Sequence, residues 1–350
     1  MKKKQVRIAL AAGSAALAMI LSGCVESGRT AGGDDKAACP WEPDKSVRTN
    51  ARIAWQKIPN GDLVVKDKRL LESCMPNADI SWKNFASGGD VVQAFGSDSV
   101  DLGLMGSSPT TIALSAPLNL QVATVWIHDV IGAAESLVAR EESVRTIDDL
   151  AGKTVGVPFS STAHYSLLQA IADAGVEDVK LVNIAPDKMP AAWQGDQIDA
   201  AWVWDPVLGK LDADGHIVMT SEDTAKAGKP TFDLGAARTD FVKKNPEFMK
   251  QWAMAQSYAV KQIKDDPEES AVSISIGTGV DPKTVKKQLP GYTYLDASEQ
   301  ASSQYLGGQL GKDLHATAKF LLAQGAIKSV SSPDVYAGGV DAAPAREASR

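Results

Sequence analysis

Histidine and cysteine are scarce in this chain, which has four His and three Cys in 350 residues. The histidines form no close pair, and no second ligand stands at metal-binding spacing from a cysteine. Phosphate-binding loops (G-x-x-x-x-G-K-[ST]) and nucleophile elbows (G-x-S-x-G) are also absent from the sequence. We therefore expect no metal, no cofactor and no enzymatic reaction.

Positive charge is also in deficit, because the formal net charge is −7 at pH 7. Residues 1–23 contain four basic and no acidic residues, so their removal would change the net charge to −11. A chain of this charge does not attract nucleic acid through its overall field. After the N-terminal region, no segment of the sequence is long and apolar enough to cross a bilayer.

The N-terminus has the pattern of an export signal. Basic residues at positions 2–7 precede an uncharged apolar run over residues 8–21, which is shorter than the about 20 residues that span a bilayer. The run ends in Leu21-Ser22-Gly23-Cys24, which resembles the lipobox of bacterial lipoproteins. This resemblance implies that Cys24 carries lipid after cleavage, whereas an ordinary signal peptide with an incidental cysteine is the alternative.

We accordingly expect a lipoprotein signal peptide over residues 1–23 and a lipidated, flexible tether over residues 24–47. The protein would be held at the extracytoplasmic face of the cell membrane by its lipid. Outside the cytoplasm, the even pair Cys39 and Cys74 predicts a disulfide that ties the N-terminal segment to the first helix. Two separate buried thiols are the alternative.

The remaining chain of about 300 residues is long enough for two lobes. Strand and helix patterns alternate in two blocks, and a mainly helical block follows, which predicts an α/β fold with a doubly wound sheet in each lobe. Lobe 1 would comprise residues 48–136 plus 237–336, and lobe 2 residues 137–236. The chain would cross between them near residues 135–138 and 233–237, and a disordered tail would occupy residues 337–350.

Two turns between a strand and a helix are rich in hydroxyl groups. One contains Ser107 and Ser108, and the other, "FSSTAHYS", contains Ser160, Ser161 and Thr162. The first N–H groups of a helix lack intrahelical partners, and the helix dipole favours an anion there. In open α/β sheets ligands lie beyond the carboxyl ends of the strands. The two turns are therefore predicted to hold an oxyanion in the interlobe cleft, with a plain serine N-cap as the alternative.

The neighbouring Ser161 and His164 also raise the possibility of a hydrolase. They lie three residues apart on one predicted helix, and no acidic residue is evident that would orient the histidine. Binding is therefore the preferred interpretation, with His164 either a donor in the cleft or a partly buried helix residue. A surface lipoprotein that only holds other proteins is a third class.

Three acids stand in or beside apolar stretches, where a lone carboxylate is costly to bury. Glu135 and Asp233 lie at the two expected crossings, so a ligand ammonium between them would explain both. A solvated charge or an interlobe salt bridge is the alternative. Asp205 precedes a proline and is either a third ligand residue or a helix cap. Trp204 could pack against an apolar part of the ligand, and Gln56 could reach the cleft.

Five segments occur in an order that resembles a known family: "GSSPTTIALSAPLNLQV", "ESLVARE", "DDLAGKTVGVPFSSTAHYSLLQAIADAG", "AAWQGDQIDAAWVWDP" and "PTFDL". Over residues 50–325 the chain resembles the taurine-binding proteins of ABC transporters, within the nitrate, sulfonate and taurine group. The resemblance implies a two-lobe, type II periplasmic-binding-protein-like fold. It also implies a monomer that captures taurine in the interlobe cleft and delivers it to an ABC permease. Another alkanesulfonate or related small anion is the alternative ligand.

Overall fold

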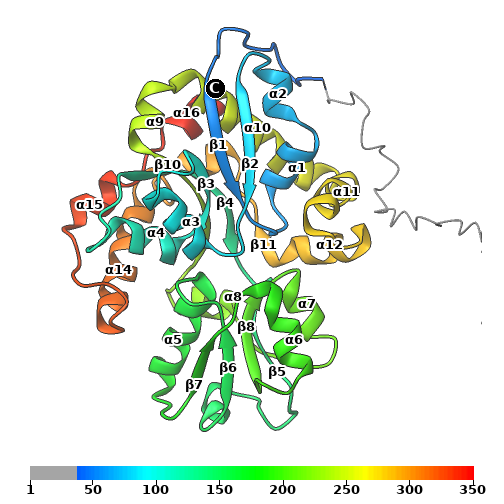
Figure 1. Ribbon diagram of the computed structural model, residues 1–350, viewed down its shortest axis with the longest axis vertical. Helices are drawn as coiled ribbons and strands as arrows, with labels where there is room; N and C mark the ends of the chain where they lie inside the picture. Colours follow the sequence, from blue (N-terminus) through cyan, green and yellow to red (C-terminus); the bar gives the residue numbers. More distant parts are fainter. Residues whose placement is uncertain (1–37) are drawn as a thin grey trace, which may run out of the picture. The chain divides into compact units, whose positions relative to one another are not determined.

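The computed structural model describes residues 38–350. The expected signal peptide, the lipidation site Cys24 and the tether up to residue 37 lie outside the described residues. Among the described residues, no helix is both long and apolar enough to span a membrane. The two-lobe α/β architecture expected from the sequence is confirmed, and each lobe is built on its own sheet (Figure 1).

The larger sheet, in lobe 1, has six strands in the order β11-β4-β10-β3-β1-β2. β1 pairs in parallel with β2 and β3, whereas β10 runs antiparallel to both β3 and β4, so the sheet is mixed. The strands are β1 (Asn50–Trp55), β2 (Asp79–Asn84), β3 (Leu102–Gly106), β4 (Val122–Ile131), β10 (Phe232–Arg238) and β11 (Tyr292–Thr293).

Helices from both ends of the described chain surround this sheet (Figure 1). The first four are α1 (Gly61–Asp67), α2 (Leu70–Cys74), α3 (Gly88–Gly96) and α4 (Ser107–Leu114). The later ones are α9 (Thr239–Lys244), α10 (Pro246–Asp265), α11 (Pro267–Thr278), α12 (Pro282–Gln288), α13 (Ala297–Ala301), α14 (Gln309–Ala323), α15 (Pro333–Gly338) and α16 (Ala343–Ala348).

The smaller sheet, in lobe 2, has five strands in the order β7-β6-β8-β5-β9. It is green throughout in Figure 1, because one continuous stretch in the middle of the chain forms the whole lobe. Its strands are β5 (Glu135–Ala139), β6 (Thr154–Val157), β7 (Lys180–Asn183), β8 (Ala200–Trp204) and β9 (His216–Thr220). Its helices are α5 (Thr162–Ala174), α6 (Met189–Gln194), α7 (Val207–Leu211) and α8 (Ser221–Lys226).

The chain crosses between the lobes a few residues earlier than the sequence indicates. Glu135 is already paired with Trp204 in the lobe 2 sheet, and Asp233 is already paired with Gly106 in the lobe 1 sheet. The crossings are therefore residues 132–134 and 227–231. As a result, each of the two acids lies in the first residues of a strand rather than in a connecting segment.

Within the described residues, the flexibility expected for residues 38–47 and the disorder expected for residues 337–350 are both wrong. In the predicted tether, Cys39 forms a disulfide with Cys74, and the Trp41 indole donates a 2.7 Å hydrogen bond to Gln251. The predicted disordered tail contains α16, whose Ala345 is fully buried. Small side chains let α16 pack closely against α10, so the alanine-rich composition reflects helix packing and not disorder.

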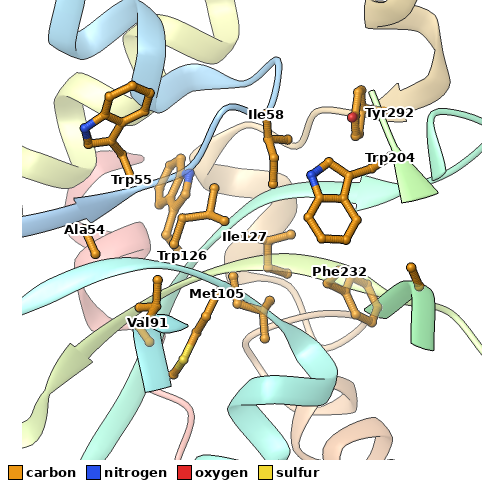
Figure 2. Packing of buried hydrophobic residues seen from close by; sticks show 14 of the residues in the cluster. Ala54, Trp55, Ile58, Val91, Met105, Trp126, Ile127, Trp204, Phe232 and Tyr292 are labelled. Carbon is orange, nitrogen blue, oxygen red and sulfur yellow. The ribbon is translucent and has the colours of Figure 1, made fainter. Parts of the chain in front are cut away.

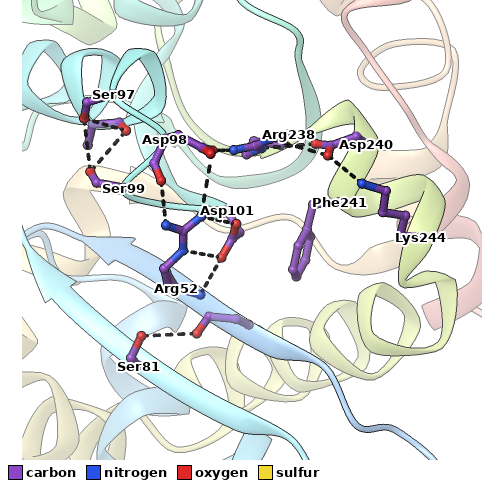
Figure 3. A network of polar contacts seen from close by, with 12 residues as sticks. Arg52, Ser81, Ser97, Asp98, Ser99, Asp101, Arg238, Asp240, Phe241 and Lys244 are labelled. Atoms are coloured by element: carbon purple, nitrogen blue, oxygen red, sulfur yellow. Dashed lines mark hydrogen bonds and ion pairs between the residues drawn. The ribbon is translucent and has the colours of Figure 1, made fainter.

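Charged residues join the strands of lobe 1 at one end of the sheet (Figure 3). The guanidinium of Arg52 on β1 binds both carboxylate oxygens of Asp101, at 2.7 and 2.8 Å, and Arg238 at the end of β10 contacts Asp98. The opposite ends of these strands carry Gln56 and Asp233. The network therefore fixes the strands at the end that faces away from the candidate site.

Candidate ligand-binding site

A small cavity of about 20 Å³ lies between the two lobes. It is formed at the carboxyl ends of β1, β3 and β8, the starts of β5, β10 and β11, and the first turns of α3, α4 and α5. Its lining residues are Gln56, Ile58, Gly88, Gly106, Pro109, Ile131, Glu135, Ser161, Thr162, Trp204, Asp233 and Tyr292. The cavity thus lies between the lobes, where the sequence analysis expects a ligand to bind.

The lobes touch at the two helix starts. A Cβ atom added to Gly106, at the end of β3, would lie 2.5 Å from Cγ2 of Thr162, at the start of α5. Real Cβ atoms do not approach other carbons so closely, so glycine at position 106 permits this degree of closure. The structure is therefore a closed arrangement, in which little space remains between the lobes.

The start of α4 lacks a side-chain cap. Its N-cap residue is Gly106, which has no side chain, and β3 leads into the helix without a loop. The first N–H groups of α4 consequently have no partner within the helix and none from a capping side chain. Such a helix start favours an anion beside it. Ser107 and Ser108 are buried in this first turn but do not line the cavity.

The start of α5 is capped by Ser161, whose hydroxyl is already engaged. The hydroxyl oxygen accepts a 3.0 Å hydrogen bond from the backbone N–H of His164, and the hydroxyl O–H donates a 2.6 Å hydrogen bond to the carbonyl of Pro158. Ser161 lines the cavity, but its hydroxyl caps the helix, which is the alternative role that the sequence analysis named.

Glu135 receives two hydrogen bonds from lobe 2. The hydroxyl of Thr162 donates to one carboxylate oxygen at 2.5 Å, and the hydroxyl of Ser221 donates to the other at 2.8 Å. Burial raises the pKa of Glu135 to about 7, although both hydrogen bonds oppose this shift. Thr162, expected from the sequence to hold the anion directly, therefore contacts a carboxylate in this structure.

Asp233 lies beside a third acid, Asp129, which the sequence analysis missed. The two residues are opposite each other in the β10–β4 ladder, and both are buried. Burial and the nearby charge of Glu135 raise the pKa of Asp233 to about 8, although hydrogen bonding with Asp129 opposes the rise. Burial raises the pKa of Asp129 well above its usual range. No basic side chain in the described part of the chain forms an ion pair with Glu135, Asp233 or Asp129.

Aromatic and aliphatic side chains complete the cavity. Figure 2 shows Ile58, Trp204 and Tyr292 close together, on segments from both lobes. The hydroxyl of Tyr292, also missed in the sequence, is buried and finds no hydrogen-bond partner among the described residues. Gln56 lines the cavity and donates a 3.0 Å hydrogen bond to the carbonyl of Leu104. The wall is thus apolar, with one phenol available to a ligand.

Besides Ser107 and Ser108, three further residues expected in the site lie outside the cavity. Ser160 is exposed, has a left-handed backbone (φ 59°) and lines a separate groove that residues of both lobes form. The imidazole of His164 stacks on Phe159, and burial lowers its pKa to about 4. Asp205 accepts a 3.1 Å hydrogen bond from the N–H of Gly209, which is the capping role that the sequence also allowed.

The same contacts count against a serine hydrolase. The hydroxyl of Ser161 accepts from the backbone N–H of His164 and not from its ring, while that ring accepts from the N–H of Ser160 at 3.4 Å. No contact therefore exists through which the imidazole could take the proton of Ser161.

Comparison with known proteins shows the family of the chain. The profile of the family described as NMT1/THI5 like matches residues 79–270, more than half of the chain. The chain belongs to the NMT1/THI5-like family. This is a family of non-enzymatic solute-binding proteins of ABC transporters.

Two relatives come from Escherichia coli (strain K12). The taurine-binding periplasmic protein is 34% identical over 263 residues, which is 73% of this chain and 81% of that protein. A putative aliphatic sulfonates-binding protein is 27% identical, over 68% of this chain and 74% of that protein.

Two solved structures share the fold. The alkanesulfonate-binding protein SsuA from Xanthomonas axonopodis pv. citri, bound to MOPS, has a TM-score of 0.69 and 24% identity, and the match covers 86% of this chain and 99% of that chain. The nitrate-binding protein NrtA from Synechocystis PCC 6803 has a TM-score of 0.68 and 16% identity. The match covers 86% of this chain and 88% of that chain.

Proposed function

We propose that the protein captures taurine (2-aminoethanesulfonate) outside the cytoplasm and delivers it to an ABC permease. The observation that carries the proposal is the pair Glu135 and Asp233, two buried carboxyls in one small cavity without a basic partner in the described residues. Buried charges need partners, and a ligand ammonium would supply one.

The two helix starts that line the cavity suit a sulfonate. The uncapped start of α4 and the start of α5 meet there, and their first N–H groups favour an anion. A sulfonate spreads one charge over three weakly basic oxygens, so several weak donors hold it better than one strong base. Ile58 and Trp204 would then pack against the two methylene groups of taurine.

In this closed arrangement the cavity has room for about one water molecule, so any ligand must open it, and a short ligand requires the least opening. The two ends of a zwitterion as short as taurine would contact the carboxyls and the helix starts at once. Taurine has about seven heavy atoms, and small ligands gain at most about 1.5 kcal/mol per atom, so high affinity requires that both ends are bound. The 34% identity to a taurine-binding protein supports the same ligand.

A second candidate ligand is an alkanesulfonate without an amine. The similarity to an aliphatic sulfonates-binding protein and to SsuA favours it. Such a ligand would leave Glu135 and Asp233 without a cation, so they would have to stay protonated.

Calorimetric titration with taurine, ethanesulfonate and ethylamine separates the two candidates. We expect Glu135→Gln and Asp233→Asn each to weaken taurine binding by about 2–5 kcal/mol, because a desolvated ammonium loses its partner. Ethanesulfonate should be affected far less. Asp62→Asn is a matched control, because Asp62 is buried in lobe 1 but does not line the cavity. If the ratio of taurine to ethanesulfonate affinity stays constant in both site variants, the taurine proposal is wrong.

We further propose that Cys24 carries the lipid anchor. The chain should fractionate with membranes and incorporate labelled fatty acid at Cys24. Cys24→Ser should release a soluble protein that still binds taurine. A Cys24→Ser variant that remains in the membrane fraction after a salt wash would refute the anchor.

A further inference from the structure

Asp129 lies directly behind one of the two carboxyls that face the cavity. It stands on β4 opposite Asp233 on β10, it is fully buried, and it does not line the cavity, whereas Asp233 does. A ligand in the cavity would therefore meet Asp233 first, and Asp129 would act on the ligand through Asp233.

The hydrogen bonding of Asp129 differs from that of Glu135. Glu135 accepts from two hydroxyl groups, as a buried anion requires. Within residues 38–350, neither oxygen of Asp129 accepts a hydrogen bond from an N–H or hydroxyl donor. A buried carboxylate with no donor is strongly disfavoured, whereas a neutral carboxylic acid needs one acceptor for its own O–H.

The groups that face Asp129 supply an acceptor but no cation. Asp233 from β10 and Glu135 from β5 are acidic, and the other titratable neighbours are the phenols Tyr292 and Tyr294. His128 precedes Asp129 on β4, and its imidazole lies 3.7 Å from the carboxylate of Asp62. Asp233 is thus the carboxyl group available to accept a proton shared with Asp129.

We propose that Asp129 is a positioning residue that stays a neutral carboxylic acid and donates its O–H to Asp233. This inference rests on the proposed function, because it assigns Asp233 as the anion that receives the ligand ammonium. When the ammonium enters, the O–H bond of Asp233 breaks and its proton leaves to water, while Asp129 keeps its own proton. The donated hydrogen bond stabilises the new Asp233 carboxylate, as protonated buried acids do for anions elsewhere.

Two substitutions distinguish this role from that of a charged or purely structural residue. Asparagine at position 129 keeps an N–H donor where the acid has its O–H, so Asp129→Asn should bind taurine within about three-fold of the wild type. Leucine has a similar volume but no donor, so Asp129→Leu should weaken taurine binding by about ten-fold or more. This is the loss of affinity expected when a hydrogen bond to a charged group is removed. Ethanesulfonate binding should change little in either variant, because it has no ammonium and does not need Asp233 ionised.

Titration calorimetry of both ligands at pH 7, with thermal melts as a folding check, measures these effects. The proposal is overturned if Asp129→Leu binds taurine as tightly as the wild type, or if Asp129→Asn loses as much affinity as Asp129→Leu. The latter result would show that the charge of Asp129 itself is needed.

Infrared difference spectroscopy tests the protonation state directly if the leucine variant does not fold. In the taurine-bound state Asp233 and Glu135 are ionised, so the carbonyl stretch of a protonated carboxylic acid should then be stronger in the wild type than in Asp129→Asn. Loss of that band on taurine binding would overturn the proposal. Above the pKa of Asp233, about 8, the same difference between the wild type and Asp129→Asn can be sought in the unliganded protein, so a wild type that fails to bind taurine would refute the proposed function without deciding the state of Asp129.

Discussion

The pH dependence of ligand affinity follows from the raised pKa values in the cavity. In the unliganded protein the pKa of Glu135 is about 7 and that of Asp233 is about 8, in both cases mainly because of burial. An ammonium binds both groups as carboxylates, so binding must release the protons that they hold. Affinity for taurine should therefore rise with pH and level off above about pH 8.

The magnitude follows from the number of protons released. Between pH 8 and pH 7 mainly Asp233 releases a proton, which changes the affinity by up to about ten-fold. Below pH 7 Glu135 releases a second proton, and the change approaches about a hundred-fold per pH unit. From pH 8 to pH 6 the upper limit is thus several hundred-fold. An open cleft hydrates both carboxyls and reduces the effect, so we expect a decrease of at least about ten-fold.

Calorimetric titration in buffers of different ionisation enthalpy gives both the affinity and the number of protons released. Ethanesulfonate is the internal control, because an anion without an ammonium binds better when the carboxyls are neutral. Its affinity should rise as the pH falls, opposite to taurine. Asp233→Asn should remove about one released proton. Taurine affinity that is constant from pH 6 to pH 8, or that changes in the same direction as ethanesulfonate affinity, would refute the reasoning.

Three further predictions concern stability and closure. Because the pKa of Asp233 is raised in the native state, the unliganded native protein holds more protons than the unfolded chain between about pH 4 and 8. The free energy of unfolding should therefore fall as the pH rises through this range. Thermal melts of Asp233→Asn should show a weaker decline. Reduction of the disulfide between Cys39 and Cys74 should cost about 3–4 kcal/mol of stability in chemical unfolding, yet leave taurine affinity unchanged, because the bridge lies outside the cavity. Gly106→Ala should prevent full closure, since the added methyl group would overlap lobe 2; small-angle scattering should then show no compaction when taurine is added.

The sequence predicts the parts of the site that depend on local patterns. A strand followed at once by hydroxyl residues and a helix pattern indicates a helix start, and both helix starts are found at the cavity. Glu135 and Asp233 were recognisable because each is a lone acid beside apolar residues. The assignment of any of these residues to the ligand stays a prediction.

Other features depend on contacts between distant segments, which local patterns do not contain. Asp129 lies in the apolar run "VWIHDVI", much as Glu135 lies in an apolar run. Only the pairing of β4 with β10 brings Asp129 next to Asp233. The hydroxyl of Thr162 looked suitable for an anion, and only its proximity to β5 reveals that it donates to Glu135. The burial of Ala345 likewise depends on α10, so composition alone suggested a disordered tail.

The bond from Thr162 to Glu135 also limits the length of the ligand. Thr162 is the first residue of α5, whose start would help to hold the sulfonate, and its hydroxyl contacts the carboxylate that would receive the ammonium. The proposed anion and cation subsites would therefore be separated by little more than one side chain. An amino-sulfonate with a short spacer can contact both without displacing Thr162. A longer spacer must either fold back or push the lobes apart, and the hydrogen bond to Glu135 would then be lost. Discrimination against longer amino-sulfonates would thus come from the protein's own interlobe contacts as well as from the volume of the cavity.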